Sequence, residues 1–266
     1  MRNLLFLICL IFCLDQSASA QLSAVKGKTF YNFWLNLPDT SILNNNPPIL
    51  IFLHGKSLSG TDLNRVKKYG VIHEIEKGRN VPAIVIAPQV SNGSWNPDKV
   101  LEILEYVQKL YKTDTNRVYV CGMSLGGYGT MHFVGKHADK ITAGVALCGG
   151  GNPKDACNLA SIPMWIQHGN RDEAVPVRYS REMVTAIKNC NNGKNLIYTE
   201  IAGANHSALE RIFRGDDMYN WLFAQVRTTA GEVVITPAPK KVEVVNSDKV
   251  QETILENKPK TIAGSN

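Results

Sequence analysis

The sequence predicts an α/β domain with a mostly parallel central sheet covered by helices on both faces. Two observations predict it. Short continuous apolar runs, typical of strands buried on both faces, alternate along the chain with segments of helical periodicity. The chain has 266 residues, of which 44% are hydrophobic and 20% charged, which is ordinary for a globular protein. We therefore expect one main domain, at residues 21–227.

Residues 1–20 have the pattern of a secretory signal peptide. A short basic start precedes an apolar run at residues 4–14, and residues 18–20 (Ala-Ser-Ala) form a small-residue cleavage site. The run is shorter than the roughly 20 apolar residues that a spanning helix needs. We expect cleavage before Gln21, no stable membrane insertion afterwards, and a periplasmic or extracellular protein. An N-terminal membrane anchor is the alternative.

Seven segments are predicted to be strands. Residues 29–35 alternate apolar and polar side chains and are expected to form an edge strand, whereas most of the others are continuous apolar runs. The strands are expected at residues 29–35, 49–53, 81–87, 118–121, 143–147, 164–168 and 196–201.

Helices are predicted between these strands. Apolar residues recur at three- and four-residue spacing from Val100 to Leu110, and Asn96 followed by a proline is a suitable start. Further helices are expected around Met131, at residues 177–187 and at residues 218–226. The region 228–266 is rich in Val, Thr, Lys, Glu and Pro, and we expect a flexible C-terminal tail. A hairpin of residues 233–236 and 242–245 is the alternative.

The charge and the cysteines exclude some functions. The formal net charge of +6 comes from scattered residues, and no nucleic-acid-binding module is present, so no nucleic-acid partner is expected. The four cysteines after residue 20 include Cys121, predicted to be a core residue, and Cys157 and Cys190, which are candidates for a disulfide. The pairing stays open, and so does Cys148. Neither a CxxC nor an HExxH motif occurs, so no metal is expected.

A nucleophilic serine is the strongest functional prediction. Residues 122–126 (GMSLG) follow an apolar strand and open a helical segment, which is the context that the G-x-S-x-G motif requires. A sharp strand-to-helix turn projects the Ser124 hydroxyl from the sheet. The glycines on either side let other backbone segments pass closely.

A serine needs a base and an orienting acid. With the chain order serine, acid, histidine, His206 is the only histidine in a late loop and is the predicted base. Asp172 follows a predicted strand and is the predicted acid, with Glu173 as its rival. The oxyanion donors are expected to be the backbone amides of Leu125, next to the nucleophile, and of Lys56.

Together these motifs resemble the α/β-hydrolase superfamily, over residues 29–226. The resemblance is narrower to its phospholipase/carboxylesterase-like, feruloyl-esterase-like and "predicted peptidase" branches, and it implies a serine triad and ester hydrolysis without a cofactor. Lys56 departs from these branches, in which small or apolar residues are common. The motifs are His54-Gly55, residues 122–129, residues 168–172 and Asn205-His206. The residues expected to line the substrate cleft are His54, Gly55, Gln89, Trp95 and Tyr128.

The leading functional hypothesis is an exported carboxylic-ester hydrolase. The segments between Ser124, Asp172 and His206 are too short to hold a large lid, so an open site that takes small or polymer-linked esters is expected, including acyl or feruloyl groups on polysaccharide. A serine peptidase of the same fold and a non-catalytic binding module remain as alternatives. The sequence leaves the oligomeric state open.

Overall fold

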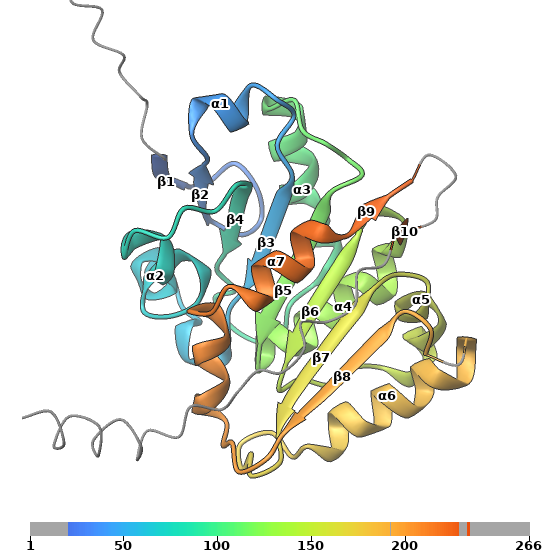
Figure 1. The fold of residues 1–266 in the computed structure, drawn as a ribbon. Helices are drawn as coiled ribbons and strands as arrows, with labels where there is room; N and C mark the ends of the chain where they lie inside the picture. Colours follow the sequence, from blue (N-terminus) through green and yellow to red (C-terminus); the bar gives the residue numbers. More distant parts are fainter. Residues whose placement is uncertain (1–20, 192, 229–232, 235–266) are drawn as a thin grey trace, which may run out of the picture.

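The computed structural model describes residues 21–191, 193–228 and 233–234, which are built around one eight-stranded sheet (Figure 1). The pairings β1–β2 and β2–β4 are antiparallel, and all pairings from β4 across to β8 are parallel. The predicted mostly parallel sheet is therefore confirmed. In spatial order the strands are β1 (Gln21–Val25), β2 (Phe33–Leu37), β4 (Ile84–Pro88), β3 (Ile49–Leu53), β5 (Val118–Met123), β6 (Ala143–Leu147), β7 (Met164–Gly169) and β8 (Leu196–Ile201).

Each face of the sheet carries a hydrophobic core. Along β3, Ile49, Ile51 and Leu53 pack into one cluster, whereas Leu50 and Phe52 pack into the other. Alternate side chains of a strand point to opposite faces, so a strand that is apolar throughout needs a core on both sides. The helices supply these two layers.

The helices divide between the two faces. The first core contains residues of α3 (Pro97–Leu110), α4 (Leu125–His137), α5 (Ala156–Ala160) and α6 (Arg178–Asn191), and the second contains residues of α2 (Val71–Glu76) and α7 (Asp217–Ala224). A short helix, α1 (Thr40–Leu43), follows β2. The predicted start of α3 is confirmed, because the Asn96 side chain accepts hydrogen bonds from the amides of Asp98 and Lys99.

Two strand predictions at the N-terminal side need correction. The strand expected at residues 29–35 begins only at Phe33, because the Thr29 hydroxyl bonds to the Tyr31 carbonyl in a turn. It is also not the edge strand, since β1 pairs with its outer side. β4 begins at Ile84 rather than at residue 81, because a tight turn bonds the Ala83 amide to the Val81 carbonyl.

The ends of the chain are only partly described. The predicted signal peptide, residues 1–20, lies outside the described residues. Val233–Val234 (β10), within the predicted tail, pairs antiparallel with Val226–Arg227 (β9). The other half of the alternative hairpin, residues 242–245, also lies outside the described residues. Across the part of the chain that is described, no helix combines the length and apolarity needed to span a bilayer.

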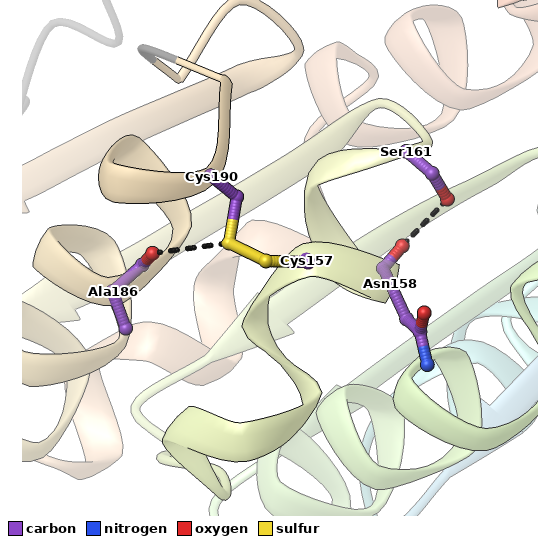
Figure 2. Close-up of a disulfide and its surroundings, with 5 residues drawn as sticks. All are labelled: Cys157, Asn158, Ser161, Ala186 and Cys190. Atoms are coloured by element: carbon purple, nitrogen blue, oxygen red, sulfur yellow. Dashed lines mark hydrogen bonds between the residues drawn. A yellow bond between two sulfur atoms is a disulfide. The ribbon is translucent and has the colours of Figure 1, made fainter.

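The two cysteines that were candidates for a disulfide are bonded to each other. Cys157 on α5 and Cys190 on α6 form a disulfide with a Cα–Cα distance of 5.2 Å (Figure 2). Cys121 and Cys148 are free and buried, which confirms Cys121 as a core residue. The bridge joins two helices on the same face of the sheet.

Candidate active site

Ser124 lies at a strained turn between β5 and α4. Its backbone has φ 60° and ψ −120°, a conformation that is costly for any residue with a side chain. A Cβ atom on Gly126 would collide with the carbonyl oxygen of Leu53, so only glycine lets α4 approach β3 this closely. The turn therefore needs the small residues of the G-x-S-x-G motif and raises the serine above the carboxyl end of the sheet.

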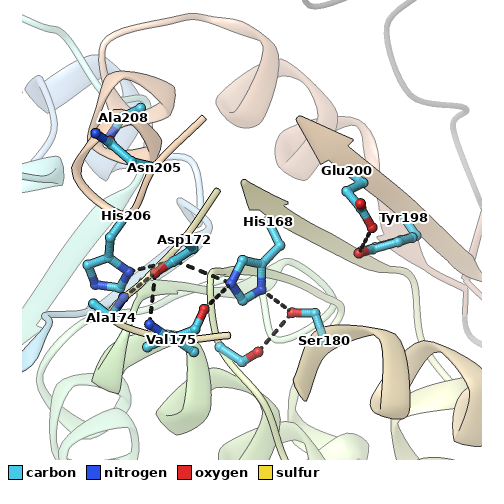
Figure 3. A network of polar contacts seen from close by, with 11 residues as sticks. His168, Asp172, Ala174, Val175, Ser180, Tyr198, Glu200, Asn205, His206 and Ala208 are labelled. Carbon is cyan, nitrogen blue, oxygen red and sulfur yellow. Dashed lines mark hydrogen bonds and ion pairs between the residues drawn. The ribbon is translucent and has the colours of Figure 1, made fainter. Parts of the chain in front are cut away.

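Asp172 and His206 meet in the loops that follow β7 and β8 (Figure 3). Asp172 follows β7 and His206 follows β8, and the His206 Nδ1 atom lies 2.7 Å from Asp172 Oδ2. The Asp172 side chain is fully buried, whereas 26% of the His206 side chain is exposed. Since a carboxylate only accepts, Nδ1 carries the proton and Nε2 is left free to take one. The rival acid, Glu173, is exposed.

The carboxylate of Asp172 is held from its other side as well. Its Oδ1 atom accepts hydrogen bonds from the amides of Ala174 and Val175, at 3.0 and 2.8 Å. Hydrogen bonds to a carboxylate stabilise its charged form. Such a carboxylate is suited to stabilising an imidazolium ion at His206.

A cavity of about 510 Å³ lies over these residues. Its lining includes the predicted residues Ser124, His206, Gly55, Lys56, Leu125 and Tyr128. Sequence reasoning missed the remaining lining residues, which are Ser57, Tyr69, Met123, Ala174, Val175, Ser207 and Glu210.

Both predicted oxyanion donors open a helix at this cavity. Leu125 is the first residue of α4, and Lys56 is the first residue of the short 3₁₀ helix η1 (Lys56–Leu58). The first N–H groups of a helix have no partner inside that helix, and its N-terminus carries positive potential. The two amides are therefore in suitable places to bind a developing oxyanion.

Tyr69 is a cavity residue that no sequence motif indicated. Its hydroxyl accepts a hydrogen bond from the Gly55 amide at 3.0 Å, and a Cβ atom on Gly55 would lie only 2.5 Å from that oxygen. Burial raises the pKa of Tyr69, so the phenol stays protonated at neutral pH. Tyr69 thus fixes the loop that carries the Lys56 amide.

His54, Gln89 and Trp95 lie behind the cavity instead of lining it. His54 is fully buried, and burial lowers its pKa to about 4. The Gln89 side chain donates to two backbone carbonyls at 2.8 Å each, and Trp95 Nε1 donates to the His54 carbonyl at 3.2 Å. Their polar atoms are used inside the fold, so the structure places them as supports of the loop after β3. Trp95 does line a neighbouring hollow of about 250 Å³, which also includes Tyr128.

One group of side chains at the site has the atom types of a metal site. The Cys148 sulfur, a carboxylate oxygen of Asp172 and a ring nitrogen of His206 lie within 4.8 Å of one another. Burial raises the pKa of the Cys148 thiol above its usual range, and a protonated thiol is a poor ligand. Since Asp172 and His206 are already bonded to each other, their proximity is explained without a metal.

Comparisons with known proteins agree with this geometry. Residues 88–154 match the model of the prolyl oligopeptidase family. A bifunctional acetylxylan esterase/xylanase from Neocallimastix patriciarum is 28% identical over 144 residues, which make up 51% of this chain and 21% of that protein. The chain thus spans about a fifth of the length of this curated relative.

Solved structures of esterases and peptidases share the fold. A thermostable esterase is 25% identical with a TM-score of 0.64, over 79% of this chain and 64% of that one. A feruloyl esterase module from Clostridium thermocellum, complexed with sinapinate, is 16% identical with a TM-score of 0.56, over 77% of this chain and 87% of that one. An acylaminoacyl peptidase from Pyrococcus horikoshii is 14% identical with a TM-score of 0.60, over 85% of this chain and 44% of that one.

These findings define the class of protein. The chain has the α/β-hydrolase fold, and the predicted resemblance to that superfamily is confirmed. Within the superfamily, it is similar to esterases and to peptidases of the prolyl oligopeptidase type.

Proposed function

We propose that this protein is a serine hydrolase that cleaves carboxylic esters through an acyl-enzyme. One observation carries the proposal: a histidine, bonded at 2.7 Å to a buried carboxylate, shares a cavity with a serine held at a strained turn. In this proposal Ser124 Oγ attacks the ester carbonyl while His206 Nε2 takes its proton. Asp172 stabilises the resulting imidazolium ion.

The later steps use the same groups. The amides of Lys56 and Leu125 bind the oxyanion, and the imidazolium ion of His206 gives its proton to the departing alcohol. Water, activated by His206, then attacks the acyl-enzyme and releases the acid. The reaction needs no metal or cofactor.

We propose an exported protein that acts on acyl or feruloyl esters, including those on polysaccharide. Support comes from the similarity to an acetylxylan esterase and to a feruloyl esterase module, and from the signal-peptide pattern of residues 1–20. A cavity of about 510 Å³ is large enough for a small acyl group with part of its alcohol.

A peptidase is the second candidate. It is favoured by the match of residues 88–154 to the prolyl oligopeptidase family. Ester and peptide cleavage use the same triad and differ in the leaving group, so substrate assays separate them. Turnover of p-nitrophenyl acetate without cleavage of peptide p-nitroanilides supports the esterase, and the opposite result supports the peptidase.

The nucleophile is tested in the full chain with a fluorophosphonate probe. We expect labelling at Ser124, and a loss of at least about 1000-fold in kcat for Ser124→Ala. Ser161→Ala is the matched control, because it alters an exposed serine whose hydroxyl donates to the nearby Asn158 carbonyl (Figure 2). An unlabelled Ser124 or a Ser124→Ala variant of near-normal activity would favour the binding module. Acetylated and feruloylated oligosaccharides, assayed beside short lipid esters, then define the substrate class.

A further inference from the structure

Asp172 lies between two imidazoles, and the mechanism above uses only one of them. The His168 Nε2 atom is 3.3 Å from Asp172 Oδ2, the same oxygen that binds His206 (Figure 3). His168 is fully buried on β7, so it does not face the cavity. The mechanism above does not explain why a buried imidazole lies beside the acid of the triad.

The partners of its Nε2 atom show that this nitrogen carries a proton. His168 Nε2 is 2.8 Å from the Val175 carbonyl oxygen, and both that oxygen and Asp172 Oδ2 only accept, so Nε2 carries a proton. His168 Nδ1 is 2.7 Å from Ser180 Oγ. Ser180 Oγ also donates to the Gly149 carbonyl at 2.8 Å, so Ser180 links the ring of His168 to the loop after β6.

The Nε2–H group of His168 can influence both oxygens of the Asp172 carboxylate. The N–H bonds to the Val175 carbonyl and so holds the loop whose amides bind Oδ1, and Nε2 also lies 3.3 Å from Oδ2. We propose that His168 is a positioning residue that orients the Asp172 carboxylate toward His206, a role that rests on the proposed function of the triad. Ser180 holds the imidazole ring in place through its contact with Nδ1.

A pair of matched variants separates orientation from simple filling of the core. The amide of His168→Gln reaches the position of Nε2 and donates there, whereas the shorter amide of His168→Asn reaches only the position of Nδ1. We expect His168→Asn to lower kcat by about 10- to 100-fold, and His168→Gln to stay within about threefold of the wild type. KM should change less than about twofold, because His168 does not line the cavity.

The control lies next to His168 on the same strand. Gln167 is 1% exposed, and within the described structure its side-chain polar atoms have no hydrogen-bond partner. Gln167→Leu removes a buried polar group without touching Asp172, and should leave kcat unchanged. Equal kcat values for His168→Asn and His168→Gln would overturn the proposal.

A second readout does not depend on activity. The His206 proton bonded to Asp172 should give a downfield proton NMR signal at low temperature. We expect the signal to persist in His168→Gln and to broaden by exchange in His168→Asn. An unchanged signal in His168→Asn contradicts the positioning role even if the protein hydrolyses none of the esters tried. Failure of the wild type to label with fluorophosphonate instead contradicts the proposed function.

Discussion

Acid should destabilise this protein through His54, and the structure indicates by how much. The imidazole is fully buried, with Nδ1 2.7 Å from the Gly55 carbonyl oxygen and Nε2 3.2 Å from the Val90 amide. An amide only donates, so Nε2 must be unprotonated. Burial is the main reason that the pKa of His54 falls from 6.5 to about 4. Protonation would also place two donors, Nε2–H and the Val90 amide, face to face.

The sign and size follow from proton binding. The unfolded chain takes up a proton near pH 6.5, whereas folded His54 does so near pH 4, so the unfolded state binds more protons between these values. The free energy of unfolding is therefore fully retained above pH 6.5 and falls as the pH falls. At 1.36 kcal/mol per pKa unit, the loss is about 2 kcal/mol at pH 5 and about 3 kcal/mol at pH 4. This is a large part of the stability of a typical domain.

The assay is urea unfolding of the wild type and of His54→Gln at about pH 7.5, 6 and 5. The Gln carbonyl can replace Nε2 as acceptor for the Val90 amide, and it does not titrate. The variant should be less stable than the wild type at about pH 7.5, but lose about 2 kcal/mol less on going to pH 5. The pKa of His168 is also lowered by burial, and its effect cancels in this comparison because both proteins contain it. Equal losses in the two proteins would refute the reasoning.

Two further predictions concern the scaffold. Replacing Cys157 and Cys190 together by serine opens a link between residues 33 apart in sequence, and should lower the free energy of unfolding by about 2–4 kcal/mol in non-reducing urea titrations; an unchanged midpoint would contradict it. Gly126→Ala forces a Cβ atom onto the Leu53 carbonyl oxygen. It should lower the free energy of unfolding by about 1–3 kcal/mol, measured in thermal melts, and should also lower the proposed esterase activity. Gly215→Ala, where the added atom meets nothing closer than 3.8 Å, is its control and should be tolerated.

The inner strands could be predicted because their sequence pattern is local. Each of β3 and β6 is a short apolar run, and such runs have few alternatives inside an α/β protein. β1 could not, because residues 21–25 are partly exposed and become a strand only by pairing with β2. Its stability comes from a tertiary contact, which no local periodicity reports.

The candidate triad could be predicted from the order of its residues along the chain. Ser124, Asp172 and His206 each follow a strand, and the carboxyl ends of parallel strands meet at one edge of the sheet. Tyr69 was not predictable, because it acts through a contact with Gly55 from a loop 14 residues away. For His54, a cavity position and a buried position look alike in sequence, since the burial depends on Val90, 36 residues further along the chain.

Two strained residues lie side by side at the centre of the site, and the sheet itself holds them. Ser124 (φ 60°) and Cys148 (φ 39°) directly follow the neighbouring strands β5 and β6. Their amides bond to the carbonyls of Leu147 and Gln167, at 2.9 and 2.8 Å, so each ladder continues one residue beyond its strand. Strain of about 1–3 kcal/mol at each residue persists only where the surroundings over-determine the backbone. The parallel sheet thus does more than carry the loops, because its last hydrogen bonds fix the backbone from which the Ser124 hydroxyl projects.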